Sequence, residues 1–310
     1  MEIFRDIASV KRLENAVLTV GTFDGLHLGH RFIIEELKKR ANFHDARSTL
    51  VTFNPHPQLV LRSPDKLDLR ILTTIDEKID LLKTFDIDRL AIIEFTYDFS
   101  RTAPAEFVKK ILYDSVGFKE IVIGHDHAFG KNRQGDFETL KKLALETGFS
   151  VNELGTFKVG EDLVSSTKIR NLLLDGDIQS ASKLLGRNYF ISGEVVKGEG
   201  RGRDLSFPTA NIKPNSSDKL IPGDGVYAVY ACFGSKKHAG MMNIGVRPTF
   251  ASNTRTLEVN LFDFNENIYG QELKIEFVER TRDEKHFSGP DELVAQLKED
   301  REKSLNILRN

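Results

Sequence analysis

The stretch from residue 20 to residue 30 limits what this chain can fold into more than any other. It reads Val-Gly-Thr-Phe-Asp-Gly-Leu-His-Leu-Gly-His. The apolar, mostly β-branched run Ala16–Val20 before it predicts a buried strand, and apolar residues at helical spacing from Ile33 to Ala41 predict a helix after it. The stretch therefore forms a turn from strand to helix. Its glycines allow a tight backbone, and the free N–H groups of the first helical turn attract anions.

Two histidines in this turn are the strongest candidates for chemistry. His27 and His30 are three residues apart, so they share one face of the turn, with only Gly29 closely beside them. Their N–H groups can point together at a phosphate, and the small Gly29 leaves space for a ring or a sugar. A zinc site is the weaker alternative, because no cysteine and no third ligand stands nearby at ligand spacing.

The order of the remaining patterns predicts an α/β protein of two domains. Strand and helix patterns alternate over residues 1–185, which predicts a Rossmann-like parallel sheet with helices on both faces. From residue 186 short alternating runs are separated by Gly, Pro and Asn, which predicts a small antiparallel β-barrel. An amphipathic pattern over about residues 291–307 predicts a C-terminal helix. We therefore expect domains at 1–185 and 186–310 that touch without a long linker.

Two loops that follow predicted strands are candidates for ligand contact. Asn54-Pro55-His56-Pro57 is a rigid loop at a strand's carboxyl end, where His56 either contacts a nucleotide or only shapes the loop. The segment 124–135 contains His125-Asp126-His127, which suggests a metal site. Because adjacent side chains point in different directions, a loop that contacts a ligand is the favoured interpretation.

A helix start near residue 165 adds a further anion site. Ser165, Ser166 and Thr167 precede an apolar helical pattern, and helix capping alone would explain them. Arg170, one turn into that helix, adds a bidentate phosphate binder beside the positive helix end. This combination suits a departing pyrophosphate.

The second half has phosphate chemistry of its own. Residues 197–203, Lys-Gly-Glu-Gly-Arg-Gly-Arg, can wrap phosphates with backbone N–H groups, although a flexible loop has the same composition. Thr209 and Asn211 fall on one side of an extended strand, and their oxygens are hard ligands suited to Mg²⁺. Glu258, on a strand whose other face is apolar, is either a general base or an exposed strand glutamate.

Composition narrows the class of protein. The chain has 310 residues, 44 Lys and Arg against 46 Asp and Glu, and a net charge of −2, so it carries no signal for a nucleic-acid partner. The single cysteine, Cys232, excludes an intramolecular disulfide and fits a reducing compartment. No signal peptide or membrane span is expected, which predicts a cytoplasmic protein.

The motifs resemble a known family along essentially the whole chain. Residues 21–30 are similar to the Gly-x-Phe-Asp-Gly-x-His-x-Gly-His signature of the nucleotidyltransferases. Together with residues 54–57, 124–135, 165–170, 200–211, 242–250 and 282–287, they resemble the bifunctional riboflavin kinases/FMN adenylyltransferases. The resemblance implies two reactions: phosphorylation of riboflavin by MgATP in the second domain, and transfer of the adenylyl group of ATP to FMN, giving FAD and pyrophosphate, in the first.

The resemblance also assigns roles to residues. It implies catalytic roles for Glu258, His27, His30 and Arg170, and Mg²⁺ binding by Thr209 and Asn211. The residues expected to bind the nucleotide or flavin are Gly21, Phe23, Asp24, Gly25, Gly29, Asn54, His56, Asp126, Ser165, Ser166, Thr167, Gly198, Gly200, Arg201, Gly202, Thr209, Asn211 and Arg282. Three positions depart from the family's common residues: Ser206 for glycine, His127 for phenylalanine and His286 for lysine. None of them removes a residue assigned to chemistry.

Two other functions remain as alternatives. A nucleotidyltransferase for another phosphorylated acceptor fits the first domain but leaves the second unexplained. A flavin-binding regulator would keep both folds and lose the catalytic residues, which are present here. The expected partners are small molecules (riboflavin, FMN and ATP), and the expected state is a monomer or a weak homo-oligomer.

Overall fold

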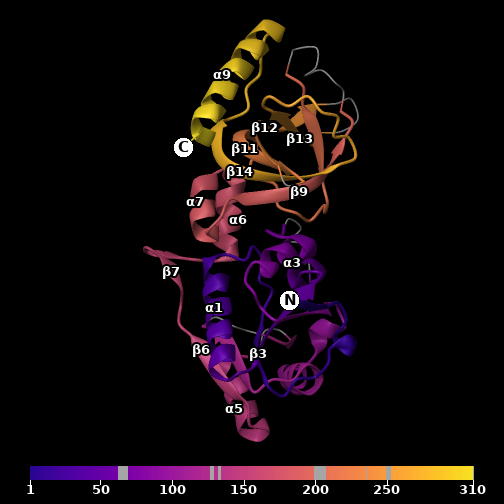
Figure 1. Ribbon diagram of the computed structural model, residues 1–310, viewed down its shortest axis with the longest axis vertical. Helices are drawn as coiled ribbons and strands as arrows, with labels where there is room; N and C mark the ends of the chain where they lie inside the picture. Colours follow the sequence, from indigo (N-terminus) through magenta and orange to yellow (C-terminus); the bar gives the residue numbers. More distant parts are fainter. Residues whose placement is uncertain are drawn as a thin grey trace. The chain divides into compact units, whose positions relative to one another are not determined.

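A computed structural model describes residues 1–61, 69–125, 129–131, 134–198, 207–234, 236–248 and 253–309 (Figure 1). The chain divides into two compact units, residues 1–165 and 166–310.

The first unit is built on a parallel sheet. Its described residues contain six strands in the order β1-β4-β3-β2-β5-β6, and every neighbouring pair is parallel. The strands are β1 (Glu2–Phe4), β2 (Ala16–Val20), β3 (Arg47–Asn54), β4 (Arg89–Glu94), β5 (Glu120–Gly124) and β6 (Ser150–Leu154). The larger helices are α1 (Leu28–Phe43), α3 (Ile75–Lys83), the π-helix η4 (Phe107–Val116) and α5 (Phe137–Thr147).

Both faces of this sheet are covered, as the alternating pattern predicts. Val17 and Leu18 are fully buried and point to opposite faces of β2. Val17 packs in one apolar cluster with Ile34 of α1 and Ile79 of α3. Leu18 packs in a second cluster with residues of η4 and α5. Burial on both sides explains why β2 reads as a continuous apolar run.

The sheet's connectivity places the glycine- and histidine-rich turn at a favourable point. From β2 the chain first adds β3 and β4 on one side, where β1 pairs with β4, and then adds β5 and β6 on the other. The strand order thus reverses at β2, and ligands of open α/β sheets bind outside the carboxyl ends of the strands at such a point. The turn that follows Val20 lies at this end.

The second unit contains a closed antiparallel barrel. Its six described strands follow the order β10-β13-β12-β11-β14-β9. They are β9 (Tyr189–Val196), β10 (Ala210–Pro214), β11 (Gly225–Phe233), β12 (Lys236–Pro248), β13 (Asn253–Leu261) and β14 (Glu272–Arg282). The C-terminal helix α9 (Pro290–Arg309) packs Val294, Leu297 and Leu308 against a cluster that contains Met241 and Phe262 (Figure 1). The predicted fold class is therefore confirmed.

Two helices precede the barrel and pack with it. They are α6 (Ser166–Leu174) and α7 (Ile178–Leu185). The Arg280 side chain of β14 lies against Gly176 in the turn between them, and Gly223 N–H donates to the Leu173 carbonyl at 2.9 Å. These contacts explain why the compact units divide at 165/166. The functional boundary expected at 185/186 stays a prediction.

The shorter elements complete the fold. They are η1 (Ile7–Ser9), α2 (Pro57–Val60), η3 (Phe99–Arg101), α4 (Pro104–Glu106), β7 (Lys158–Val159) and β8 (Asp162–Leu163). Within the described ranges, no helix combines the length and apolar character needed to cross a membrane.

Candidate nucleotide sites

The β2–α1 turn brings its two histidines together, as their spacing predicts. The rings of His27 and His30 are stacked, with centroids 3.6 Å apart and planes at 15°. His27 is the N-cap of α1: its Nδ1 accepts a hydrogen bond from the His30 backbone N–H at 3.3 Å. Because Nδ1 is an acceptor, a neutral His27 carries its proton on Nε2. The Nε2–H of His27 is therefore a hydrogen-bond donor at the N-terminus of α1.

The electrostatics of the stack favour a neutral His30. Burial, the neighbouring His27 and the charge of Lys78 together hold the pKa of His30 well below its usual value. His30 Nδ1 has no hydrogen-bond partner among the described residues. A buried nitrogen without a partner is costly, so this atom is a candidate to meet a ligand.

Other motif residues form the support of the turn. Phe23, Gly25 and Leu26 all have positive φ, at 46°, 81° and 41°. The Asp24 carboxylate is 1% exposed and accepts from the backbone N–H groups of Leu72 and Thr73, each at 3.0 Å. Phe23 is also buried, at 2%. The side chains of Phe23 and Asp24 are thus buried in the support of the turn. Their expected contact with a ligand stays a prediction.

The motif glycines are required for close approach. A Cβ on Gly29 would lie 3.2 Å from the His27 ring, and one on Gly21 would lie 3.2 Å from the Phe23 ring. A Cβ on Gly25 would lie 2.7 Å from Leu72 Cδ1, at a φ that side chains rarely adopt. These glycines keep the turn compact beneath the histidines.

The loop after β3 lies beside a cluster of aromatic rings. Asn54 is exposed, and His56 Nδ1 accepts from Gln58 N–H at 3.2 Å and so caps α2. The Phe53 ring is 5.7 Å from that of Phe95, and the Phe95 ring is 5.5 Å from that of Phe99. Such a cluster at the carboxyl ends of β3 and β4 suits a planar aromatic ligand. The sequence reasoning did not name these phenylalanines.

The predicted anion site near residue 165 falls at the division between the two units. Ser165 ends the first unit, while Ser166, Thr167 and Arg170 begin α6 in the second. Arg170 is 9% exposed. Their meeting with the histidine stack stays a prediction. Asp126, His127, Gly200, Arg201, Gly202 and Ser206 lie outside the described residues.

The barrel assembles the second group of predicted residues. Thr209 Oγ1 donates to Glu258 Oε2 at 3.4 Å, and Asn211 of β10 is the register partner of Glu258 on β13. Asn260 is 4% exposed, and its Nδ2 donates to the Pro208 carbonyl at 2.7 Å, which holds the segment before Thr209. The sequence reasoning missed Asn260, although its i+2 spacing from Glu258 was visible.

Gly198 and a pocket complete this barrel site. A Cβ on Gly198 would collide with the Asn211 amide, so the glycine backbone lies directly against that side chain. A pocket of about 460 Å³ adjoins Thr209. Its lining is Val195, Pro208, Thr209, Ala210, Val259, Leu261, Phe264, Asn265, Glu266, Asn267, Ile268 and Tyr269. An apolar pocket next to a hydroxyl and a carboxylate suits a ring whose polar substituents reach Thr209 and Glu258.

Arg282 is held inside the second unit. Its Nε and Nη2 donate to the Asp300 carboxylate at 2.8 and 2.7 Å, and Nη1 donates to the Asp283 carbonyl at 2.8 Å. Asp300 of α9 is 3% exposed. This pair ties α9 to the end of β14, and ligand binding by Arg282 stays a prediction. His286 is exposed in the segment between them.

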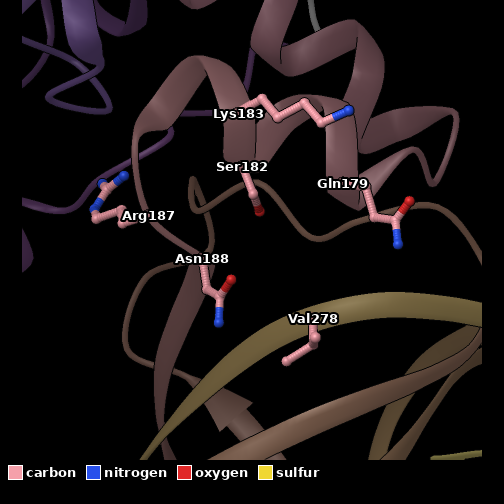
Figure 2. Close-up of a pocket in the computed structure, with 6 residues that line it drawn as sticks. All are labelled: Gln179, Ser182, Lys183, Arg187, Asn188 and Val278. Carbon is pink, nitrogen blue, oxygen red and sulfur yellow. The ribbon is translucent and has the colours of Figure 1, made fainter. Parts of the chain in front are cut away.

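A second pocket is lined by none of the predicted site residues. Its volume is about 480 Å³, and its lining is Gln179, Ser182, Lys183, Arg187, Asn188 and Val278 (Figure 2). Figure 2 shows the Lys183 amine directed away from the middle of this group. The pocket lacks a carboxylate or histidine, so the barrel pocket beside Thr209 is the better candidate site.

Comparison with known proteins gives concordant results for both parts of the chain. A family model described as FAD synthetase matches residues 9–168, and one described as riboflavin kinase matches residues 185–308. Proteins named bifunctional riboflavin kinase/FMN adenylyltransferase from Buchnera aphidicola (subsp. Schizaphis graminum) and Escherichia coli (strain K12) are 37% and 35% identical. Each alignment covers 97% of this chain and 96% of the relative.

A further relative and a solved structure agree over most of the chain. The protein of the same name from Listeria monocytogenes is 36% identical over 92% of this chain and 90% of its own. A crystal structure described as a macrolide-efflux protein from Streptococcus pneumoniae has a TM-score of 0.88 and 31% identity over 98% of both chains. Its description names a different function from those of the curated relatives.

Proposed function

This chain belongs to the family of bifunctional riboflavin kinase/FMN adenylyltransferases, and from this premise we propose which residues carry its two reactions. The carboxyl-terminal part is the riboflavin kinase, and the amino-terminal part is the FMN adenylyltransferase. Riboflavin, FMN and ATP are the small molecules on which it acts. The stacked pair His27–His30 at the capped start of α1 is the observation that carries the assignment of the adenylyltransferase site.

In the kinase, Glu258 is the general base. It takes the proton of the riboflavin hydroxyl that attacks the γ-phosphorus of ATP, and ADP leaves. The Thr209 hydroxyl, 3.4 Å from the Glu258 carboxylate, orients that carboxylate before the substrate arrives. Phosphoryl transfer depends chiefly on positioning and on neutralising charge, so a rigid barrel edge is a suitable support.

The residues of the barrel edge fit a magnesium ion. Thr209 and Asn211 offer a hydroxyl and an amide oxygen beside the half-buried Glu258. Among the described residues no group of three acidic, histidine or cysteine side chains could hold a metal by itself. Mg²⁺ commonly keeps several waters and binds through few protein oxygens together with substrate phosphates, where it neutralises phosphate charge. Thr209 and Asn211 would hold it here.

In the adenylyltransferase, no protein nucleophile is needed. An FMN phosphate oxygen forms a bond to the α-phosphorus of ATP while the bond to the pyrophosphate oxygen breaks. His27, through its Nε2–H, and His30 donate to the triphosphate oxygens on which negative charge develops, and Arg170 with Ser166 and Thr167 binds the pyrophosphate. The aromatic cluster of Phe53, Phe95 and Phe99 supports a flavin position near the loop after β3.

A chromatographic time course tests both assignments at once. Purified protein with riboflavin, ATP and Mg²⁺ should form FMN first and then convert it to FAD. Glu258→Gln should lower FMN formation by about 100-fold or more and leave conversion of added FMN unchanged. His30→Ala should give the reverse pattern. Glu272→Gln, at an exposed glutamate on β14, is the matched control for the first variant and should leave both rates unchanged.

The outcomes separate the two sites. Normal FMN formation by Glu258→Gln would show that another group is the base. Loss of both activities in His30→Ala would indicate a folding defect, which circular dichroism would reveal. Loss of FMN formation in Glu272→Gln would mean that the barrel, and not Glu258, is sensitive to substitution.

The remaining expectations are part of the same proposal. We keep 185/186 as the functional boundary, since the riboflavin kinase match begins at residue 185. A cytoplasmic location is supported by the single cysteine, Cys232. A monomer or weak homo-oligomer that binds neither nucleic acid nor membrane is tested by light scattering of the purified protein and by binding assays.

A further inference from the structure

A buried lysine lies beside the β2–α1 turn and has no part in the reactions above. Lys78 of α3 is 4% exposed. Its Nζ donates to the Thr22 carbonyl at 2.7 Å and to Thr52 Oγ1 at 3.3 Å. Thr52 Oγ1 in turn donates to the same Thr22 carbonyl at 3.2 Å. Two donors therefore converge on one carbonyl of the turn that carries the histidines.

The start of α3 fixes where this lysine stands. Thr74 and Glu77 form a reciprocal capping box, with Glu77 N–H bonded to Thr74 Oγ1 and Thr74 N–H bonded to the Glu77 carboxylate. The two residues before it, Leu72 and Thr73, are bonded to Asp24 of the turn. Lys78 comes directly after Glu77. The segment before the lysine is therefore held at Leu72 and Thr73 by Asp24 and at Thr74 and Glu77 by the capping box. A long, flexible side chain is thereby held in one place.

The surroundings make this ammonium a local source of positive charge. Among the described residues, Asp24 in the turn and His30 at α1 interact electrostatically with Lys78, and Glu77 precedes it in α3. Burial lowers the pKa of Lys78 to about 8, while Asp24 favours its charged form. At neutral pH Lys78 is charged and His30 is neutral. Lys78, and not His30, then supplies positive charge to this site.

We propose that Lys78 is a positioning residue of the nucleotide-transfer site: its buried ammonium holds the Thr22 carbonyl in the turn and keeps a positive charge near the two histidines. The inference rests on the proposed role of the turn in FMN adenylylation. A preoriented charge in a buried site stabilises the triphosphate and the developing pyrophosphate without reorganising during the reaction. A neutral His30 can donate a hydrogen bond, but it supplies no net charge.

The proposal predicts a pH dependence in the wild-type enzyme. Lys78 is protonated below its pKa of about 8 and loses its charge as the pH rises through that value. The kcat/KM for ATP in FMN adenylylation reports groups of the free enzyme, so it should fall through about pH 8. Riboflavin phosphorylation by the same sample should not show this dependence on Lys78.

Three variants identify the group responsible. Lys78→Met removes the charge and the donors and should lower kcat/KM near pH 7 by at least about tenfold, because a displaced reacting group loses rate steeply. Lys78→Arg keeps a charge that does not titrate, so it should keep activity within about tenfold of wild type and lack the alkaline fall. Lys83→Met, at an exposed lysine on the same helix, should match wild type throughout. Riboflavin phosphorylation measured on each sample reports whether the barrel is intact.

Each result decides the question. An unchanged rate and profile in folded Lys78→Met, or an alkaline fall that persists in Lys78→Arg, overturns the proposal. Should neither variant fold, the wild-type profile decides, and a constant kcat/KM through about pH 8 overturns it. The variant His30→Ala distinguishes a failure of the proposed histidine site from a failure of the proposed role of Lys78. Full adenylylation by His30→Ala would refute the proposed role of the histidine turn, on which the inference rests. Loss of adenylylation in His30→Ala together with a normal Lys78→Met would refute only the role of Lys78.

Discussion

Asp24→Asn tests the hydrogen bonds that hold the histidine turn in place. The Asp24 carboxylate receives the Leu72 N–H at 3.0 and 3.1 Å through its two oxygens, and the Thr73 N–H at 3.0 Å. Asparagine keeps one of the two oxygens but turns its NH₂ group, a donor, toward the Leu72 N–H, which is also a donor. A hydrogen bond to a charged group contributes about 1.5–3 kcal/mol. The change also removes the anion that favours the charged form of Lys78.

We therefore expect the first unit to lose about 2–4 kcal/mol of its free energy of unfolding. With a urea m-value of about 2 kcal/mol/M, the midpoint falls by about 1–2 M. Circular dichroism measures the transition, and hydrogen exchange of the peptide that contains Leu72 and Thr73 reports the local effect. Asp80→Asn, which removes an exposed carboxylate paired with Lys83, is the control and should shift the free energy by at most about 0.5 kcal/mol. If Asp24→Asn behaved like this control, with unchanged exchange at Leu72, our account of the turn would be refuted.

Gly25→Ala should destabilise the first unit by about 2–3 kcal/mol, because a positive φ costs about 1–2 kcal/mol and the new Cβ would lie 2.7 Å from Leu72 Cδ1. Gly148→Ala, with φ of 85° and nothing within 4 Å of its Cβ, should show the conformational cost alone, and equal losses in urea unfolding would argue against the steric contribution. Asp300→Ala leaves the Arg282 guanidinium without its carboxylate, so we expect the second unit to lose about 2–3 kcal/mol and FMN adenylylation to remain; a thermal melt unchanged from wild type would contradict this. Thr209→Val should raise the Mg²⁺ concentration that half-activates FMN formation, and an unchanged activation curve would exclude Thr209 as a ligand.

Local sequence patterns were sufficient to predict the fold class and to predict that the two histidines lie on one face of the β2–α1 turn. The apolar run Ala16–Val20 specifies a buried strand because a strand covered on both faces needs apolar side chains in both directions. The spacing of His27 and His30 puts both on one side of the helix start, where the structure shows their rings stacked. The alternation within β13 likewise placed Glu258 opposite a buried face.

Contacts between distant segments were decided only by the tertiary structure. Asp24 was expected at the ligand, yet its partners Leu72 and Thr73 are nearly fifty residues away, and no local pattern records such a pairing. Arg282 was expected to bind a ligand, but its guanidinium is paired with Asp300 of α9. Lys78 occupies one position in an ordinary amphipathic helix, and its burial follows from the packing of that helix against the turn. Sequence specifies the period and the capping of each element, because these depend on neighbours along the chain. Which charges become buried together depends on how the elements pack, and packing joins residues whose separation in sequence is arbitrary.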